Sequence, residues 1–252
     1  MSIKIVFKDA KTFARILSYN AEFDKTISTV VLRPDGFHMQ TMDASHTSIN
    51  ELKLPPEYFE IYEVHTEEIQ IGLPLEIVYD FIKNVKHETL TLMKTDTSPN
   101  IQLSVVSDDG FEACLSVKSI NQDSELFQIP PMPPNCIFHV DLLTLKKWSS
   151  FLPKKGAIKF VPEKKTIRVE STTDSGSFKL CEQVEYEHFK KPNHVQVGSV
   201  VMDKIYKLMH FGFPIAFKLV NDAPLQCSVD LGSNVKMFSY FAPMIEDEME
   251  LE

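Results

Sequence analysis

SINQDSELFQIPPMPPN, residues 119 to 135, is the stretch that divides this chain. Four of the fifteen prolines fall in its last six residues, at positions 130, 131, 133 and 134. Proline fixes φ and removes a backbone donor, so this composition is typical of an extended, stiff connector. The halves on either side are similar in length and repeat one order of expected elements. We therefore predict an α+β protein with two similar domains, 1–118 and 136–252, joined by connector 119–135.

Each half is expected to contain two helices packed on antiparallel strands. In the first half the helices are predicted at 9–20 and 74–85, and in the second half at 141–152 and 199–211. Asp9 and Asp141 are suited to cap two of them. Apolar residues recur at i, i+3, i+4 and i+7 in the first helix, which is typical of a face that packs on a core. Strands are predicted at 3–7, 27–32, 37–42, 48–54, 68–71, 89–94, 101–106, 111–118, 136–140, 157–161, 166–170, 177–182, 215–220, 225–230 and 235–241.

Composition places the chain among ordinary globular proteins. It has 252 residues, of which 43% are hydrophobic and 24% charged. The sequence contains no apolar run near the roughly 20 residues of a membrane span, and no signal peptide is expected at its start. The four cysteines are far apart and fit neither a zinc site nor a disulfide framework, which favours a reducing compartment.

The sequence offers little support for an enzyme, a metal site or a cofactor. Glycines are at least fourteen residues apart, which excludes a phosphate-binding or dinucleotide loop. Asp43, Ser45 and His46 have the side-chain types of a hydrolase triad, but neighbours on an extended chain point to opposite faces. We interpret them as a hairpin turn. The carboxylates of Asp108 and Asp109 are of the kind that can bind a metal ion, yet a turn explains the Ser-Asp-Asp-Gly pattern.

The charges are unevenly distributed along the chain. The helical segments together carry a charge of +5, made up of +1, 0, +3 and +1 for residues 9–20, 74–87, 141–155 and 199–211. Because the net charge of the whole chain is −9, the remaining residues carry −14. One interpretation is that lysine is simply a good exposed helix residue. The other is that the helices share a surface that meets phosphate, while an acidic exterior repels it elsewhere.

Three local motifs resemble the proliferating cell nuclear antigen family. Residues 42–52, MDASHTSINEL, resemble its first-domain hairpin, residues 123–130, DSELFQIP, its interdomain connector, and residues 240–248, YFAPMIEDE, its tail. They occur in the family's order and at suitable distances. The resemblance extends over the rest of the chain as element order.

The resemblance implies a non-enzymatic DNA sliding clamp with the DNA-clamp fold. In that family three copies join head to tail into a ring around duplex DNA, with the helices lining the hole. The ring binds DNA without reading sequence and tethers DNA polymerase and other replication and repair proteins; the implied location is the nucleus, or a viral or archaeal site of DNA replication. The residues implied to face DNA are Lys11, Arg15, Lys83, Lys146, Lys147, Lys204, Lys207 and His210. For each, the alternative is an ordinary solvated helix face.

The resemblance also implies two protein-binding surfaces. The edge strands that would join subunits contribute Phe111, Ala113, Leu115, Val117, Phe178 and Leu180. An apolar groove for clamp-binding peptides would be formed by Met42, His46, Ile49, Phe127, Ile129, Pro224, Tyr240, Ala242 and Pro243. The alternatives are interior strands and plain core. Lys164 and Lys165 lie near the position of a ubiquitin-accepting lysine of the eukaryotic family, although the surrounding residues do not match.

Several alternatives stay open from the sequence. The chain is compatible with a clamp-fold subunit of a mixed ring, and with a monomeric polymerase accessory factor. A third possibility is a two-domain scaffold that binds peptides and never surrounds DNA, which the net charge of −9 favours and the basic helices oppose. Dependence on a clamp loader is likewise open.

Overall fold

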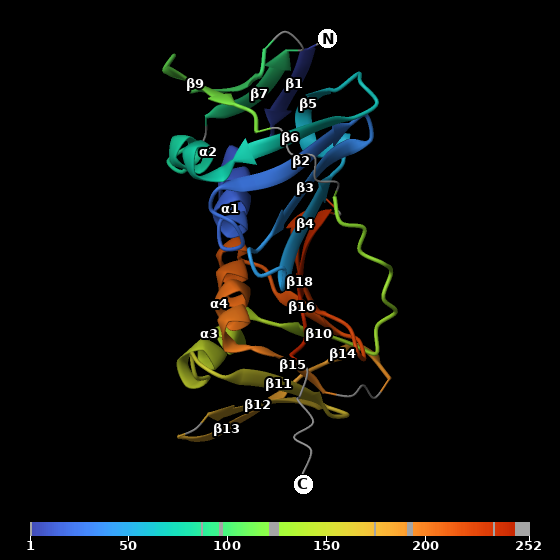
Figure 1. The fold of residues 1–252 in the computed structure, drawn as a ribbon. Helices are drawn as coiled ribbons and strands as arrows, with labels where there is room; N and C mark the ends of the chain where they lie inside the picture. Colours follow the sequence, from blue (N-terminus) through green and yellow to red (C-terminus); the bar gives the residue numbers. More distant parts are fainter. Residues whose placement is uncertain are drawn as a thin grey trace. The chain divides into compact units, whose positions relative to one another are not determined.

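The computed structural model describes residues 2–86, 88–95, 98–120, 126–173, 175–190, 194–233 and 235–244. The chain divides into two compact units (Figure 1). The first unit comprises Met1–Gln128 and Leu231–Met237, and the second Ile129–Asp230 and Phe238–Glu252. Residues 121–125 of the predicted connector, residues 245–248 of the tail motif and the following residues 249–252 lie outside the described residues. None of the described helices combines the length and the apolarity that a membrane span requires.

The first unit contains two antiparallel arrays of strands. One sheet has the order β5-β1-β7-β8-β9, and the other array runs β6-β2-β3-β4. The strands are β1 (Ser2–Phe7), β2 (Ile27–Arg33), β3 (Gly36–Met42), β4 (Ser48–Leu54), β5 (Phe59–Glu63), β6 (Ile69–Pro74), β7 (Thr89–Thr95), β8 (Asn100–Val106) and β9 (Glu112–Lys118). A short 3-10 helix, η1 (Pro56–Tyr58), precedes β5.

Two helices lie on one side of the strands of the first unit (Figure 1). Helix α1 (Ala10–Asn20) begins after Asp9, whose side chain accepts a hydrogen bond from the Thr12 amide at 2.9 Å, as predicted. Helix α2 (Leu75–Ile82) follows β6, and its Leu75 amide donates to the Thr26 carbonyl at 3.1 Å. The predicted placement of Pro74 inside this helix is wrong, because Pro74 ends β6 in an extended conformation.

Both helices are held on the strands by the packing of their apolar side chains. The buried stripe of α1 includes Phe13 and Leu17, as its periodicity predicts. Phe13 lies 4.1 Å from Phe7 and 6.0 Å from Phe37 between ring centroids, so the helix is fixed to strands β1 and β3 by aromatic contacts. Val78 of α2 is fully buried. The exposed residues of α1 are polar, whereas those of α2 are Glu76, Asp80 and the apolar Ile77, which is 52% exposed.

The second unit repeats this plan. Its strand arrays are β13-β12-β11-β15 and β14-β10-β16-β17-β18. The strands are β10 (Cys136–Val140), β11 (Ala157–Pro162), β12 (Thr166–Thr173), β13 (Gly176–Gln183), β14 (Tyr186–Phe189), β15 (Val195–Gly198), β16 (Ile215–Leu219), β17 (Leu225–Gly232) and β18 (Val235–Phe241).

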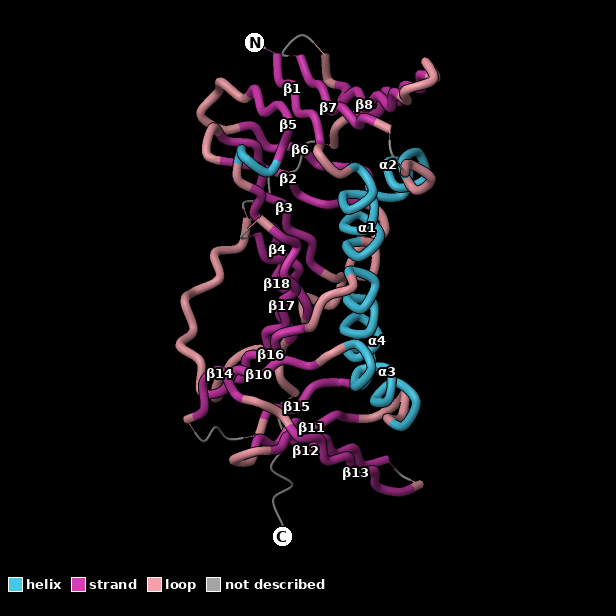
Figure 2. The backbone as a smooth tube through the Cα atoms, turned by 180° about the vertical axis from the view of Figure 1, so that it is seen from behind, coloured by secondary structure: helices cyan, strands magenta, loops and turns pink. Residues whose placement is uncertain are grey.

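Helices α3 (Leu142–Phe151) and α4 (Ser199–Lys207) lie on one side of the second unit's strands, as Figure 2 shows. Asp141 caps α3 by accepting from the Thr144 amide at 2.7 Å. Helix α4 continues into the 3-10 helix η2 (Leu208–Phe211), so the predicted single helix 199–211 is split in two. Trp148 of α3 packs against Phe217 with ring centroids 5.9 Å apart.

Candidate functional sites

The basic residues of the first unit's helices are exposed on the side away from the core. Lys11 and Arg15 are one turn apart on α1, opposite its buried stripe. Lys83 follows the last turn of α2 and is also exposed, but its Nζ lies 2.7 Å from Asp80 Oδ1. That hydrogen bond raises the pKa of Lys83. Lys83 therefore has a local acidic partner that the sequence analysis did not use, although the i, i+3 spacing indicates it.

The second unit carries its predicted basic residues on α3, α4 and η2. Lys146 and Lys147 are exposed on α3. Lys204 and Lys207 are in the last turn of α4, where a positive charge is favourable because of the helix dipole. His210 is exposed in η2. The described structure thus leaves most of the predicted DNA-facing side chains open to solvent, and Lys204 half-buried.

The start of the connector is attached to β6 at a position that only glycine fits. The Gly72 amide donates to the Ile120 carbonyl at 3.0 Å, and the Ile120 amide donates to the Gly72 carbonyl at 3.1 Å. A Cβ atom at position 72 would lie 2.3 Å from the Ile120 oxygen. The backbones therefore approach more closely than any side chain at this position permits.

Further along, Gln40 of β3 holds the connector at Phe127. The Phe127 amide donates to Gln40 Oε1 at 2.7 Å, and Gln40 Nε2 donates to the Phe127 carbonyl at 3.1 Å. Gln40 is buried, whereas the Phe127 side chain is half exposed. The connector at this point therefore has a fixed backbone and an accessible aromatic ring. Sequence reasoning missed Gln40, because its partner is 87 residues away.

A hollow of about 240 Å³ lies in the first unit beside this contact. Its lining includes three residues predicted for the peptide groove, Met42, His46 and Phe127. The other lining residues are Asp24, Ile27, Thr29, Gln40, Thr41, Asp43 and Ala44. Ile49 is paired with Met42 in the β3–β4 ladder and is half-buried.

The hairpin beside this hollow is a turn organised by Asp43, as the sequence indicates. Asp43 Oδ1 accepts from the amides of Thr47 at 2.8 Å and Ser48 at 3.1 Å, and the Asp43 carbonyl accepts from the His46 amide at 2.9 Å. His46 has a φ of 57°, which turns the chain. The carboxylate of Asp43 is therefore occupied with the backbone of the turn.

The second unit has its own hollow, of about 430 Å³, near the last described residues. It is lined by His194, Val195, Gln196, Val220, Asp222, Ala223, Pro243 and Met244. Pro243 is thus the predicted groove residue that lines it. The Met244 amide donates to the Gln196 carbonyl at 2.8 Å, which fixes the chain after β18. Ile129, Pro224, Tyr240 and Ala242 are half-buried in this unit.

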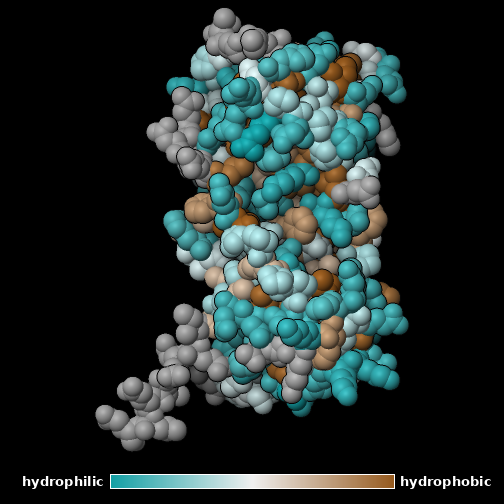
Figure 3. All heavy atoms as spheres, turned by 90° about the vertical axis from the view of Figure 1, so that its right-hand side faces the viewer, coloured by the Kyte–Doolittle hydropathy of each residue, from teal (hydrophilic) through white to brown (hydrophobic). Residues whose placement is uncertain are grey.

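Apolar surface is limited on the face of the molecule drawn in Figure 3. Hydrophilic side chains predominate there, and hydrophobic ones form small patches between them. Small, scattered apolar patches of this kind are normal on a protein surface and do not by themselves indicate a binding site.

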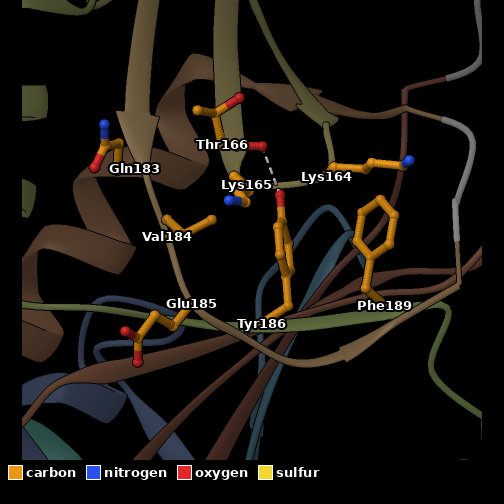
Figure 4. A pocket seen from close by; sticks show the side chains of 8 residues that line it. All are labelled: Lys164, Lys165, Thr166, Gln183, Val184, Glu185, Tyr186 and Phe189. Carbon is orange, nitrogen blue, oxygen red and sulfur yellow. Dashed lines mark hydrogen bonds between the residues drawn. The ribbon is translucent and has the colours of Figure 1, made fainter.

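A third hollow, which the sequence analysis did not predict, lies at one end of β12 and β13. It has a volume of about 940 Å³, and Figure 4 shows Lys164 and Lys165 at its rim with Tyr186 and Phe189. The Tyr186 hydroxyl donates to the Thr166 carbonyl at 2.6 Å, and burial raises the pKa of Tyr186. The remaining lining residues are Gln183, Val184 and Glu185.

Strands β9 and β13 are at the ends of their sheets. In β9, the predicted interface residues Ala113, Leu115 and Val117 are half-buried and alternate with exposed polar ones. In β13, Leu180 is half-buried and Phe178 is 44% exposed. Phe111, just before β9, is 60% exposed. The described chain therefore presents two sheet edges with apolar side chains, although an apolar edge is a liability unless it is paired.

The acidic loop between β8 and β9 is a turn, as its sequence indicates. The Ser107 hydroxyl donates to Asp109, and the Phe111 amide donates to Asp109 Oδ1 at 3.2 Å. These hydrogen bonds lower the pKa of Asp109, with the Ser107 contact the larger cause. Among the described residues, no three His, Cys, Asp or Glu side chains are grouped to hold a metal ion.

Comparisons with known proteins agree with this geometry. Residues 3–126 match the family described as Proliferating cell nuclear antigen, N-terminal domain. The chain is 20% identical over 225 residues to "Probable DNA polymerase sliding clamp 2" of Paramecium bursaria Chlorella virus 1, covering 88% of this chain and 83% of that protein. It is 23% identical over 261 residues to "DNA polymerase sliding clamp" of Thermococcus fumicolans, covering 98% and 100%.

The fold has a close counterpart among solved structures. The crystal structure of Proliferating Cellular Nuclear Antigen from Entamoeba histolytica superimposes with a TM-score of 0.84 over 96% of this chain and 99% of that one, at 16% identity. Two units of mixed helices and antiparallel strands are consistent with that architecture. The chain therefore has the α+β DNA-clamp fold and belongs to the proliferating cell nuclear antigen family of sliding clamps.

Proposed function

We propose that three copies of this chain join head to tail into a ring that surrounds duplex DNA and tethers the replicative polymerase and other replication and repair proteins. The names of the matched relatives support a sliding-clamp role. The observation that carries the proposal for DNA is the exposure of basic side chains on the helices of both units, in a chain whose net charge is −9. Positive charge is concentrated there, against the overall balance.

Binding of this kind needs no base recognition and no catalytic group. Lysine and arginine attract phosphates at every position of the duplex, so the attraction is independent of sequence and falls with salt. The proposed contacts are Lys11, Arg15, Lys83, Lys146, Lys147, Lys204, Lys207 and His210. We expect Lys83 to contribute least, because Asp80 competes for its charge. Persistence on DNA would come from ring closure, with a clamp loader opening the ring.

The proposed protein-binding groove takes a short peptide with aromatic and aliphatic anchors. Its first-unit part is the hollow lined by Met42, His46 and Phe127, with Ile49 beside it. Its second-unit part consists of Ile129, Pro224, Tyr240, Ala242 and Pro243. Partners of this class include DNA polymerase, and the protein would act where DNA is replicated, in the nucleus or at a viral or archaeal replication site.

The proposed contact between copies is a ladder between β9 of one copy and β13 of the next. It would cover the exposed side chains of Phe111 and Phe178, with Ala113, Leu115, Val117 and Leu180. Pairing would also satisfy the open backbone groups of both strands. Because the two edges differ, the contact is heterologous and generates a ring when the rotation closes.

One other function has a specific observation in its favour. A net charge of −9 opposes DNA binding and suits a scaffold that binds peptides only. Two measurements separate the proposals. Light scattering gives the mass of the assembly, for which we expect three times the 28.8 kDa chain. Retention on nicked circular DNA, compared with the same DNA linearised, then tests encirclement.

A ring is expected to stay on the circle and to leave the linear form through its ends. Equal retention on both forms contradicts encirclement, and a mass of one chain across micromolar concentrations contradicts the ring. The scaffold proposal predicts no retention on either DNA at physiological salt.

A further inference from the structure

The two accessible cysteines of this chain lie on the two edge strands. Cys114 is exposed in β9 and Cys181 is exposed in β13. The other two, Cys136 and Cys227, are fully buried in the second unit. The exposed thiols are therefore on the strands that we propose to join copies, and their placement can be examined strand by strand.

The backbone of β9 directs Cys114 to the open edge. The Ser107 amide donates to the Phe111 carbonyl at 3.0 Å, and the Ser119 amide donates to the Pro99 carbonyl at 3.0 Å. These bonds flank the β8–β9 ladder and place the odd-numbered residues of β9 in hydrogen-bonded pairs with β8. Even-numbered residues therefore turn their N–H and C=O groups away from β8. Cys114 is one of them.

The backbone of β13 directs Cys181 in the same way. The Val184 amide donates to the Lys165 carbonyl at 3.1 Å, in register with the β12–β13 ladder. Even-numbered residues of β13 therefore bond to β12, and odd-numbered residues turn their N–H and C=O groups to the open edge. In an antiparallel ladder between β9 and β13, the type of pairing found throughout both sheets, an even residue of β9 must face an odd residue of β13.

The side chains impose the same rule independently. Leu115 and Val117 project from one face of β9, and Phe178 and Leu180 project from one face of β13. Paired residues in a ladder project from the same face, so joining the apolar faces also requires odd β9 residues opposite even β13 residues. The backbone hydrogen bonds and the side-chain faces therefore require the same odd–even pairing. The registers that remain possible differ from one another by two residues.

Pairing residues 112–118 with residues 177–183 gives every residue of one segment a partner in the other. It places Leu115 opposite Leu180 and Val117 opposite Phe178, which joins apolar side chains. It also places Cys114 opposite Cys181.

Shifting the register by two residues is less favourable in either direction. One shift places Lys118 opposite Lys179 and Leu115 opposite Glu182, which sets like charges together and an apolar side chain against a carboxylate. The other places Val117 opposite Gly176, which has no side chain to pack against it, and shortens the ladder. The full-length register is therefore preferred.

We propose that Cys114 of one copy and Cys181 of the next form a disulfide under oxidation, which locks the ring covalently at the contact between copies; this inference rests on the head-to-tail assembly proposed above. Opposite residues in a hydrogen-bonded antiparallel pair have Cα atoms about 5.5 Å apart, within the range of a disulfide. After a shift of two residues they are diagonal, at about 7–8 Å, and out of reach. The cross-link thus reports the register.

The oxidant is a small disulfide such as oxidised glutathione. One cysteine thiolate attacks it, releases one reduced glutathione and forms a mixed disulfide; the second thiolate then displaces the second glutathione. Two protons leave the protein thiols and two electrons pass to glutathione. Burial raises the pKa of Cys136 to about 12 and that of Cys227 as well, so neither competes.

The test uses the full-length protein with oxidised glutathione, followed by electrophoresis in denaturing gels without reductant. We expect bands of two and three chain lengths that dithiothreitol removes, and a Cys114–Cys181 peptide in mass spectrometry. Cys114→Ser and Cys181→Ser are each expected to abolish cross-linking. An equal mixture of the two variants is expected to restore the two-chain band, because one supplies Cys181 and the other Cys114.

Cross-linking that persists in either single variant overturns the inference, since it requires like cysteines to meet. Light scattering under reducing conditions tests the ring assembly separately from the disulfide. If the wild-type protein assembles when reduced but does not cross-link, the disulfide is wrong and the ring stands. If the reduced protein has the mass of one chain across micromolar concentrations, the ring is wrong and the disulfide falls with it.

Discussion

Gln40 contacts the backbone of Phe127 with both atoms of its side-chain amide, one accepting at 2.7 Å and the other donating at 3.1 Å. The contact joins a buried residue of β3 to a connector whose aromatic side chain is half exposed. A groove residue on a loose loop would have to be ordered at each binding event, which costs affinity. The geometry instead holds Phe127 in place beforehand.

Replacing Gln40 with alanine is expected to release this part of the connector. Each neutral hydrogen bond contributes about 1 kcal/mol, so loss of both is expected to raise hydrogen exchange of the Phe127 amide by about 5- to 30-fold. Gln40→Glu keeps an acceptor for the Phe127 amide and is expected to have a smaller effect. Exchange measured on peptides covering residues 126–135 tests this, with the exposed Gln102→Ala as control. Unchanged exchange in Gln40→Ala contradicts the role.

Reversing two charges on α3 is expected to weaken DNA binding. In Lys146→Glu/Lys147→Glu, two proposed phosphate contacts are lost from each copy. The slope of log affinity against log salt is expected to fall by about 0.9 for each contact removed. Titration of duplex DNA at several salt concentrations measures it. The matched control is Lys164→Glu/Lys165→Glu, which makes the same charge change outside the helices. Equal loss in both variants points to net charge alone and contradicts the assignment.

A buried polar network behind the hairpin is expected to be sensitive to truncation. Asn20 Oδ1 accepts from Thr41 Oγ1 at 2.7 Å and from Asn50 Nδ2 at 3.1 Å, and Asn20 is fully buried. Asn20→Ala leaves both donors without that acceptor and is expected to destabilise the first unit by about 2 kcal/mol. Urea unfolding followed by circular dichroism tests this. Asn84→Ala, at an exposed position after α2, is expected to change little.

Ionisation of Tyr58 is expected to lower the stability of the folded protein at alkaline pH. Burial, with a smaller contribution from the charge of Asp9, raises the pKa of Tyr58 to about 12. The folded protein therefore favours the neutral phenol, and this stabilisation is complete below pH 10 and lost as the pH rises from 10 to 12. Melting temperatures measured across that window are expected to fall less steeply in Tyr58→Phe than in the wild type. Parallel curves contradict the coupling.

Long, strongly patterned elements were predictable from the sequence. Helix α1 has a capping Asp9 and a regular apolar stripe, and β10 and β18 were predicted with their observed bounds. The strands β5, β14 and β15 were missed. They are four or five residues long, and segments such as YEHF have no clear apolar alternation. Such strands form because neighbouring strands supply hydrogen bonds, which a local pattern does not indicate.

The candidate sites were predictable to different degrees. Lys146 and Lys147 stand out in sequence because a helix concentrates charge that the remainder of the chain opposes. Gln40 does not stand out, since its role depends on a contact between residues 87 positions apart. The hollow lined by Lys164 and Tyr186 likewise depends on the meeting of separate strands. Contacts between distant residues need the folded chain.

In the proposed ring, the two unlike edges, β9 and β13, would give each copy two different ends. Every added copy would then have the same orientation, and growth would stop when the free β9 at one end of an arc pairs with the free β13 at the other. A chain with a charge introduced at Phe178 alone would still offer β9. Added in small amounts to the wild type, this variant would end arcs of one or two copies and prevent ring closure in proportion to its concentration. A contact between identical surfaces would show no such difference between the two ends.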